Sequence, residues 1–461
     1  MQHTTLILVL LALMALAYHL GRRRARAVAG AGGVRSLHSL PGYYGLYAAI
    51  WCGLPALLVF GVWTLLQDTV ITSLVVSGLP ESVRALPEAR LGLVVNDIRN
   101  LAEGNIVSGT VDARMQAAAD HYTSLERISW AALAVVVLSL AGAGMALAWR
   151  LISPALRSRN RVEAVVRYLL VTSSTIAIFT TVGILLSVLF EAARFFQMVP
   201  PSEFLFGLDW SPQMAIREDQ VGSSGAFGAI PLFAGTLLIS LIAMAVAVPV
   251  GLMSAIYLAE YAGRRFRSIA KPVLEILAGI PTVVYGFFAA LTVAPLIRDN
   301  GALLGLDVSP ESALAAGLVM GIMIIPFVSS LSDDVINAVP QAMRDASYGV
   351  GATQSETIRQ VILPAALPGI VGGILLAVSR AIGETMIVVM AAGLSANLTA
   401  NPLESVTTVT VQIVTLLVGD QEFDSPKTLA AFALGLLLFA VTLVLNVIAL
   451  HVVRKYREQY E

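Results

Sequence analysis

The sequence predicts an all-α, polytopic membrane protein with about nine transmembrane helices. Hydrophobic residues occupy 57% of the 461 positions and charged residues only 13%, so most of the chain cannot be the core of a soluble domain. The apolar runs are about 17 to 26 residues long, which matches helices that cross a hydrocarbon layer of about 30 Å. They lack the strict alternation of apolar and polar residues that is typical of an outer-membrane barrel.

The nine predicted spans are distributed along the whole chain. They cover about residues 4–20, 43–66, 129–152, 168–190, 231–258, 272–297, 312–332, 367–392 and 428–452. Proline interrupts several of them, for example at Pro249, Pro281 and Pro326. Such breaks are tolerated where neighbouring helices or water satisfy the freed carbonyl groups. They therefore favour a helix bundle that lines a path, although each one could also be an ordinary kink.

The distribution of basic residues predicts the orientation of the chain. With the N-terminus outside, the inside segments contain 19 of the 29 Arg and Lys residues and the outside segments contain nine, while Arg380 lies within a span. Because cytoplasmic loops carry the excess of basic residues, we expect a multi-pass membrane protein with its N-terminus outside and its C-terminus in the cytoplasm. The first span precedes its arginines, unlike a signal peptide, and is expected to be a retained anchor.

The chain divides near residue 165 into two predicted parts. Residues 1–165 form an N-terminal extension with about three transmembrane helices and a small periplasmic helical segment at 67–128. The alternative for that segment is a solvated loop between extended helix ends. Residues 166–461 contain the other six spans, joined mostly by short connections, and form the predicted transport core.

A polar segment, Arg344–Pro364, lies between two long apolar runs and is predicted to be cytoplasmic. Two short helices, at 341–348 and 354–362, are expected to flank a turn at Gly349 and Gly351, because glycine tolerates the positive φ angles that other residues resist. A protein that only packs helices in lipid has little use for such a loop. The segment is therefore predicted to be a surface knob that fits a partner protein.

Arg380 and Glu384 are the charged residues in the middle of the eighth predicted span. Their spacing of four would place them on one face of a continuous helix. A charge at the bilayer centre costs on the order of 2.5 to 3.5 kcal/mol, so we expect the two to pair. In the functional interpretation, Arg380 offers a forked positive charge to a passing anion, and Glu384 positions it and neutralises it when the path is empty. The alternative is a buried ion pair that only specifies packing.

Other acidic residues at the predicted cytoplasmic ends of spans are interpreted as structural. Asp333 and Asp334 would place negative charge at a helix C-terminus, which is unfavourable, so they are expected to cap the next helix or to pair with Arg344. Glu275 is expected to reach the membrane surface or to pair with Lys271 one turn earlier.

The usual supports of an enzyme function are missing from the sequence. A phosphate-binding loop needs Gly-Lys followed by Ser or Thr, and none of the three lysines, Lys271, Lys427 and Lys455, follows a glycine. No cluster of His, Cys or carboxylate residues has the spacing of a metal site. We therefore expect a chain that is not an enzyme and that holds no metal or cofactor. Its net charge of −1 also argues against a nucleic-acid partner.

The polar segment resembles the EAA loop of ABC importer permeases. That pattern starts with Glu-Ala-Ala and has a glycine four residues after the second alanine. It ends with an aliphatic residue, one residue of any type, and then Leu-Pro. The matching positions here are Asp345, Ala346, Ser347, Gly351, Val361, Leu363 and Pro364. Asp for Glu, Ser for the second Ala and Val for Ile are departures that keep acidity, size and branching. The resemblance implies that the loop at 341–364 forms coupling helices, which dock in a groove of a separate ATPase subunit.

Four further segments resemble the phosphate-importing branch of this family, in particular its PstC-type permease subunit. They are residues 204–212 (Phe-Leu-Phe-Gly-Leu-Asp-Trp-Ser-Pro), Pro231 with Gly235 and Thr236, residues 278–286, and residues 380–386 (Arg-Ala-Ile-Gly-Glu-Thr-Met). The PstA-type subunit shares the Arg-x-x-Gly-Glu-Thr core but tends to continue with Ala-Pro, so Met386–Val389 favours the PstC type. The resemblance covers about residues 165–456 and implies a six-span, MetI-like core.

The resemblance implies a protein of the bacterial inner membrane, with a periplasmic N-terminus, and a role in the import of inorganic phosphate from the periplasm to the cytoplasm. The implied partners are a second, PstA-like permease, two PstB-like cytoplasmic ATPase subunits that hold ATP and Mg, and a PstS-like periplasmic phosphate-binding protein. One alternative is a permease for another oxyanion, such as sulfate, molybdate or phosphonate, or for a quite different solute. Another is a membrane receptor or regulatory subunit with a sensing N-terminal segment. The first 165 residues have no function assigned by the resemblance.

Overall fold

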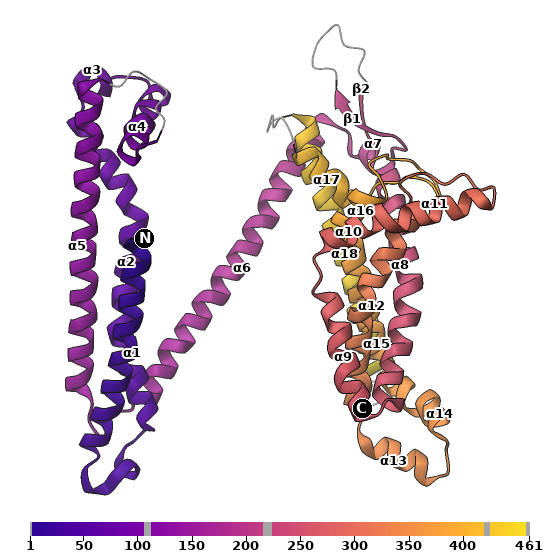
Figure 1. Ribbon diagram of the computed structural model, residues 1–461, viewed down its shortest axis with the longest axis horizontal. Helices are drawn as coiled ribbons and strands as arrows, with labels where there is room; N and C mark the ends of the chain where they lie inside the picture. Colours follow the sequence, from indigo (N-terminus) through magenta and orange to yellow (C-terminus); the bar gives the residue numbers. More distant parts are fainter. Residues whose placement is uncertain (1, 106–111, 215–223, 419–424, 458–461) are drawn as a thin grey trace. The chain divides into compact units, whose positions relative to one another are not determined.

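The computed structural model describes residues 2–105, 112–214, 224–418 and 425–457, which form two compact units, Met1–Phe179 and Thr180–Glu461 (Figure 1). Within these described ranges, nine helices are long and apolar enough to cross a membrane, in agreement with the predicted fold class. Their ranges are Thr4–Val28, Pro41–Gly78, Ala113–Leu151, Ser158–Met198, Ile230–Tyr261, Thr282–Leu303, Ala313–Ala338, Gln354–Ile382 and Pro426–His451.

The first unit is built from long helices. It contains α1 (Gln2–Val28), the short 3-10 turn η1 (Gly30–Ser36), α2 (Pro41–Gly78), α3 (Glu81–Arg84), α4 (Glu88–Glu103), α5 (Ala113–Leu151) and the start of α6 (Ser158–Met198). Small residues bring its helices together. A Cβ atom on Gly21 would lie 2.8 Å from the Cβ of Ala48, and one on Gly144 would overlap the carbonyl oxygen of Trp51. Close backbone approach through glycine is how helices pack in lipid.

The segment between α2 and α5 has a small core of its own. Ile71 and Val75 at the end of α2 pack with Ile98 of α4 and Tyr122 of α5, and all four are buried. α4 ends at Gly104, whose φ of 78° is the left-handed conformation that closes a helix. The described part of this segment is therefore helical, and residues 106–111 lie outside the described residues.

The second unit contains the remaining elements. They are α7 (Pro201–Phe206), β1 (Trp210–Met214), β2 (Ser224–Phe227), α8 (Ile230–Ile256), η2 (Tyr257–Tyr261), α9 (Arg264–Ala278), α10 (Thr282–Phe288), η3 (Ala289–Val293), α11 (Ala294–Leu303), α12 (Ala313–Ala338), α13 (Gln341–Gly349), α14 (Gln354–Thr357), η4 (Ile358–Ile362), α15 (Leu363–Ile382), α16 (Met386–Ala391), α17 (Val409–Leu417) and α18 (Pro426–Arg457). β1 and β2 form an antiparallel pair in which Trp210 faces Phe227.

The centre of the second unit is the pair α8 and α12. Ile239 and Ala243 of α8 and Met320 and Ile324 of α12 are almost completely buried in one cluster. A Cβ atom on Gly321 would lie only 2.9 Å from the carbonyl oxygen of Ala243. The two helices therefore approach backbone to backbone and form a rigid support for the surrounding shorter helices.

The sixth predicted span, at 272–297, is wrong as a single helix. α9 ends at Ala278, and the helix that is long enough to cross a membrane starts at Thr282. Proline disfavours the helical conformation of the residue before it, and Pro281 is itself extended, with ψ of 137°. The Gly279–Pro281 sequence was the available signal for this break.

The eighth predicted span, at 367–392, is also divided. α15 starts earlier, at Leu363, and ends at Ile382, and a separate short helix, α16, follows Gly383–Thr385. The region after it, predicted to be an outside loop, contains α17. Val409 and Val411 of α17 are fully buried, so this helix forms through tertiary packing that its short apolar run did not reveal.

Candidate functional site

The predicted cytoplasmic knob consists of two short helices at one end of the second unit. α13 and α14 project beyond the helix bundle, at the end where the described part of α18 finishes (Figure 1). The turn between them contains Gly351, whose φ of 89° confirms the predicted left-handed glycine. Gly349 is instead the last residue of α13 and has no positive φ. The second helical piece, predicted to end at Ile362, continues through the wide π turn η4 directly into α15.

Arg344 anchors the knob to the bundle. Its Nη2 donates a hydrogen bond to Oε1 of Glu260 at 3.0 Å, and its guanidinium also donates to the carbonyl oxygens of Val339 and Ile336, at 2.5 and 2.8 Å. The two side chains of this ion pair are only 10% and 8% exposed. Removing one partner of such a pair would leave the other charge buried and unpaired, which is strongly destabilising.

Glu260, at the end of the π turn η2, also reaches the second half of the knob. Its backbone carbonyl oxygen accepts a hydrogen bond from Nε2 of Gln354 in α14, at 2.7 Å. The two knob helices are joined to each other by the hydroxyl groups of Ser347 and Thr357, 2.9 Å apart and buried. The hydrogen bond of Ser347 therefore closes the inside of the knob, and both knob helices are attached to Glu260 of η2.

The outer surface of the knob is exposed and partly apolar. Asp345 and Ala346 face solvent, and Asp345 accepts a hydrogen bond from Gln341 at 3.0 Å. Val350, beside Gly351, is 87% exposed. Met343 and Tyr348 of α13 are exposed as well, and a group of exposed apolar residues that is rimmed by polar ones is typical of protein–protein contacts.

The last matched residues lie where the knob joins the membrane helix. Val361, Leu363 and Pro364 are half-buried, and Leu363 packs against the cluster that contains Ile358 and Ile362. Pro364 is the second residue of α15 and directly follows the π turn η4, so the helix is widened where the proline N–H is missing from its hydrogen-bond ladder. The sequence-predicted coupling residues therefore divide into an exposed tip and a packed base.

A capping box starts α14. The side chain of Thr353 accepts a hydrogen bond from the N–H of Glu356, while the Glu356 carboxylate accepts from the N–H and the hydroxyl of Thr353, at 2.8 and 2.7 Å. These hydrogen bonds, from the backbone of Thr353 first, lower the pKa of Glu356 below its ordinary value. The arrangement satisfies two free N–H groups reciprocally and fixes the direction in which the chain leaves the Gly351 turn.

The predicted partners of Asp333 and Asp334 are wrong. Both residues lie inside α12, which continues to Ala338, so neither caps α13. Asp333 is buried and binds Arg267 Nη2, 2.9 Å from each carboxylate oxygen, and Lys271 Nζ at 2.8 Å. Asp334 is 3.2 Å from Lys271.

This cluster attaches α9 to α12. The hydrogen bond to Asp333 raises the pKa of Lys271. Because Lys271 binds the two aspartates, the proposed pairing of Glu275 with Lys271 is also wrong, and Glu275 is exposed. Pairings between helices could not be predicted from the spacing of residues within one helix.

Arg380 lies in the last turn of α15 and is exposed. Its guanidinium carbon is 5.7 Å from the centre of the Phe327 ring, in a cation–π contact with α12. Among the described residues, no carboxylate forms an ion pair with it. A positive charge is favourable at a helix C-terminus, and the forked donors of this guanidinium stay available to an anion.

The predicted pairing of Glu384 with Arg380 is wrong, because the helix ends between them. Gly383 follows the last helical residue, Ile382, and a spacing of four brings side chains together only in a continuous helix. Oε1 of Glu384 instead accepts a hydrogen bond from the N–H of Met386 at 3.2 Å, and its backbone carbonyl accepts from Thr410 at 2.9 Å. Glu384 therefore holds the start of α16 and the start of α17.

Sequence motifs outside the knob explain how this broken region is positioned. A Cβ atom on Gly235 would overlap the carbonyl oxygen of Thr407, so only glycine allows that segment to cross α8. The neighbouring hydroxyl of Thr236 accepts a hydrogen bond from the N–H of Val409 at 3.1 Å. Together they fix the first turn of α17 against the bundle.

Two further motif residues act on the same region. Nε1 of Trp210 donates to Oε1 of the buried Gln412 in α17, at 3.0 Å. A Cβ atom on Gly286 would lie 2.7 Å from the sulfur of Met390, so α10 and α16 are in close contact. The sequence resemblance included these residues but assigned them no role. In the structure they contact α16 and α17, the two helices that follow the end of α15.

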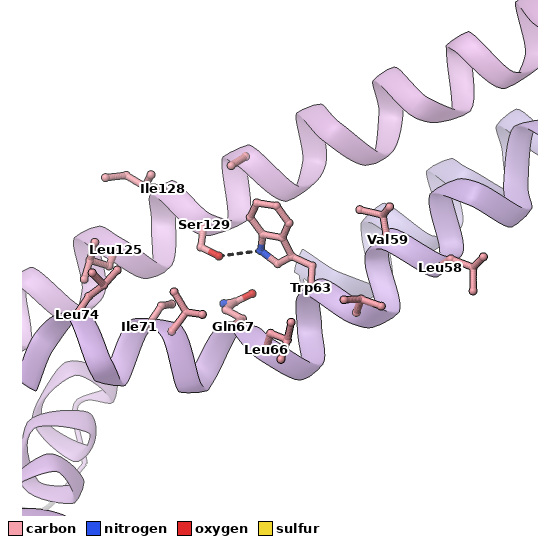
Figure 2. A pocket seen from close by; sticks show the side chains of 13 residues that line it. Leu58, Val59, Trp63, Leu66, Gln67, Ile71, Leu74, Leu125, Ile128 and Ser129 are labelled. Atoms are coloured by element: carbon pink, nitrogen blue, oxygen red, sulfur yellow. Dashed lines mark hydrogen bonds between the residues drawn. The ribbon is translucent and has the colours of Figure 1, made fainter.

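The first unit has an apolar groove between α2 and α5, with a volume of about 610 Å³. Figure 2 shows aliphatic side chains around it, with Nε1 of Trp63 donating a hydrogen bond to Ser129 at 3.0 Å and Gln67 nearby. None of the residues that line the groove is charged. It therefore lacks the cations that an anion would require.

Two family models match the chain. Residues 247–458 match the inner membrane component of binding-protein-dependent transport systems. Residues 7–180 match a family described as a phosphate ATP-binding cassette transporter. The N-terminal extension, which had no function assigned from its sequence, lies within this second match from residue 7 onward, and it lies within the first compact unit.

Curated relatives match over a large part of their length. A probable ABC transporter permease of Bacillus subtilis, YqgH, is 31% identical over 289 residues, which cover 62% of this chain and 86% of the relative. The phosphate transport system permease PstC 1 of Mycobacterium tuberculosis is 32% identical, with 55% and 81% covered. PstC of Mesorhizobium japonicum is 30% identical, with 48% and 72% covered.

These relatives are permeases, which are not themselves enzymes, and membership in their class implies partner subunits that bind ATP and substrate. The chain belongs to the ABC transporter permease family, as a PstC-like, multi-pass subunit of an inner-membrane importer.

Proposed function

We propose that this permease subunit moves inorganic phosphate from the periplasm to the cytoplasm. Relatives that are phosphate permeases and the phosphate-transporter family match of residues 7–180 support this cargo. The structural observation that carries the proposal is the exposed guanidinium of Arg380 at the end of α15. It offers a positive charge that no carboxylate of the described chain neutralises.

In this proposal Arg380 binds phosphate transiently as the anion passes. Arginine forms two parallel hydrogen bonds with phosphate oxygens, and its contact with Phe327 orients it without cancelling its charge. Glu384, which holds the break between α15 and α16, sets where Arg380 lies and is a positioning residue. Binding must stay weak enough for release, as in any conducting path.

Energy reaches this path through the knob. Closure of two PstB-like ATPase subunits, which hold ATP and Mg, moves the exposed tip at Asp345, Ala346 and Val350. Because α14 continues through η4 into α15 without a break, displacement of the knob is transmitted along the helix whose last turn contains Arg380. The remaining proposed partners are a PstA-like second permease and a PstS-like phosphate-binding protein, with the knob and the C-terminus on the cytoplasmic side.

The test is the uptake of radiolabelled phosphate by cells in which this transporter is the only phosphate transporter. Arg380→Gln should lower uptake at least about tenfold, since a hydrogen bond to a charged group contributes about 1.5 to 3 kcal/mol. Arg298→Gln, which removes an exposed arginine of α11, is the matched control and should transport normally. Membrane protein level and co-purification of the ATPase are measured in parallel. Unchanged uptake in Arg380→Gln would show that this residue does not serve the path.

Competition experiments separate the alternative cargoes. Unlabelled phosphate should abolish the uptake of label, whereas sulfate, molybdate and phosphonate at equal concentration should not. If one of those oxyanions competes as well as phosphate, the importer class stands and the cargo is wrong. A receptor or regulatory role for the extension is tested by deleting residues 1–150. Intact transport with altered signalling would support that role.

A further inference from the structure

One end of the first unit is strongly basic. Residues 21–42 and 150–167 contain ten arginines and a single acidic residue, Glu163. In the part of the chain that the structure describes, Arg159 alone among the ten has an ion pair, with Glu163 at 2.6 Å. Loops with this excess of arginine face the cytoplasm. Most of the ten can be explained by topology alone, so a binding site requires a more specific arrangement.

The two basic segments are held together at the same end of the unit. The N–H of His38 donates to the carbonyl oxygen of Pro154 at 3.0 Å, and the N–H of Arg159 donates to Oγ of Ser39 at 3.3 Å. Oη of Tyr44 donates to the carbonyl oxygen of Leu156 at 3.0 Å. These hydrogen bonds therefore fix the loop that leads into α2, and with it the surface that this loop forms together with α1.

A cavity of about 550 Å³ opens between the end of α1 and this loop. Tyr18, Arg22 and Arg26 follow one another at intervals of four residues, and so lie on one face of α1. Leu40 and Leu46 contribute apolar walls from the other side, and they are 68% and 43% exposed. The cavity thus combines two guanidinium groups, which form no ion pair within the described ranges, with exposed aliphatic side chains.

α1 and α2 are closely packed beside the cavity. A Cβ atom on Gly45 would lie 2.7 Å from the ring of Tyr18, and one on Gly21 would lie 2.8 Å from the carbonyl oxygen of Tyr44. The last turns of α1 and the first turns of α2 are already in contact along this line. In the part of the chain that the structure describes, neither Arg22 nor Arg26 has an ion pair, so an external anion can supply their counter-charge.

We propose that this cavity binds an anionic phospholipid, with the headgroup phosphate between Arg22 and Arg26 and the acyl region against Leu40 and Leu46. The arginines directly follow the apolar run of α1, which is the depth at which lipid phosphates lie. Basic pockets between transmembrane helices on the cytoplasmic side are suited to such headgroups, and guanidinium groups bind phosphate oxygens in pairs. The apolar walls favour a lipid over a free anion. The inference does not depend on the transported substrate.

The test is native mass spectrometry of the full-length protein, in the assembly in which it purifies, with phosphatidylglycerol or phosphatidylcholine of identical acyl chains. The wild type should retain phosphatidylglycerol preferentially. The Arg22→Gln/Arg26→Gln variant should bind it about 30-fold more weakly, from the usual contribution of each arginine near a membrane surface. Arg23→Gln/Arg35→Gln removes the same charge from the same end but from outside the cavity, and should bind almost as the wild type does.

Control measurements separate lipid binding in the cavity from misfolding and from the binding of a free anion. Arg22→Lys/Arg26→Lys should restore most of the binding, which shows that the loss in the glutamine variant is not a failure to fold. Inorganic phosphate at millimolar concentration should not displace the lipid. Equal losses in the two glutamine variants, equal retention of both lipids, or displacement by inorganic phosphate or by an acidic peptide would each overturn the proposal.

Discussion

Arg344 and Arg380 lie on elements that follow each other along the chain, but they face opposite environments. Arg344 is buried and has a carboxylate and two backbone carbonyl groups as acceptors. Arg380 is exposed at the end of α15, where it contacts the ring of Phe327 and, among the described residues, pairs with no carboxylate. The hydrogen-bond donors of Arg344 are therefore bound within the protein, whereas those of Arg380 are available to a ligand. The difference teaches that a charged residue in a membrane protein must be interpreted from its partners and not from its position in an apolar run.

The most sensitive test of this comparison is to remove each arginine. Arg344→Met should destabilise the protein by about 3 to 5 kcal/mol, because Glu260 stays buried without its partner. Arg380→Met should leave the unfolding temperature close to that of the wild type, since its side chain is exposed. Arg359→Met, which removes an exposed arginine from the same loop, is the control.

Thermal unfolding of the purified protein measures these differences. The double variant Arg344→Met/Glu260→Met should recover much of the loss, because it removes both buried charges. Similar unfolding temperatures for Arg344→Met and Arg359→Met would mean that the buried ion pair does not hold the knob.

The cluster around Asp333 tests the same principle with a carboxylate. Asp333→Asn should cost about 1.5 to 3 kcal/mol, because it weakens charged hydrogen bonds to Arg267 and Lys271 at a buried position. Asp334→Asn changes a residue whose side chain is 65% exposed, and a surface ion pair contributes about 0 to 1 kcal/mol. Chemical denaturation of both variants measures the difference, and equal effects would contradict the assigned burial.

The turn of the knob should affect coupling more than stability. Gly351→Val forces a branched residue into a left-handed conformation, which costs roughly 1 to 2 kcal/mol, although a Cβ atom there has open space. We expect ATP hydrolysis to continue while phosphate uptake falls. Gly349→Ala, at a helical position with equally open space, should remain coupled. If both variants transport normally, the shape of the turn is not needed for docking.

The smallest expected effect concerns the capping box. The lowered pKa of Glu356 means that the folded protein prefers the ionised carboxylate. Its contribution to stability is therefore complete above the ordinary value of 4.5 and is lost as the pH falls through the lowered folded pKa. Glu356→Gln should lower the unfolding temperature slightly at neutral pH, and the difference from the wild type should shrink in acid. A difference that is constant with pH would rule out a role for the ionised form.

Local signals in the sequence were sufficient for many features. Long apolar runs identified nine spans, and Gly351 was correctly expected to be left-handed. Gly383 and the Gly279–Pro281 sequence were also visible as helix breakers, but the hydrophobicity around them favoured continuous helices. The errors in spans six and eight therefore came from giving length and apolarity more weight than turn chemistry.

The membrane class, the number of spans and the polar knob were determined by the sequence itself, because burial in lipid depends on runs of neighbouring residues. Only the tertiary structure decided which charges pair. Arg344 binds Glu260, which is 84 residues away in the sequence. Glu384 accepts a hydrogen bond from the N–H of Met386 and does not pair with Arg380. Ion pairs depend on distances of a few ångströms between separate helices, and these distances exist only after the helices have packed.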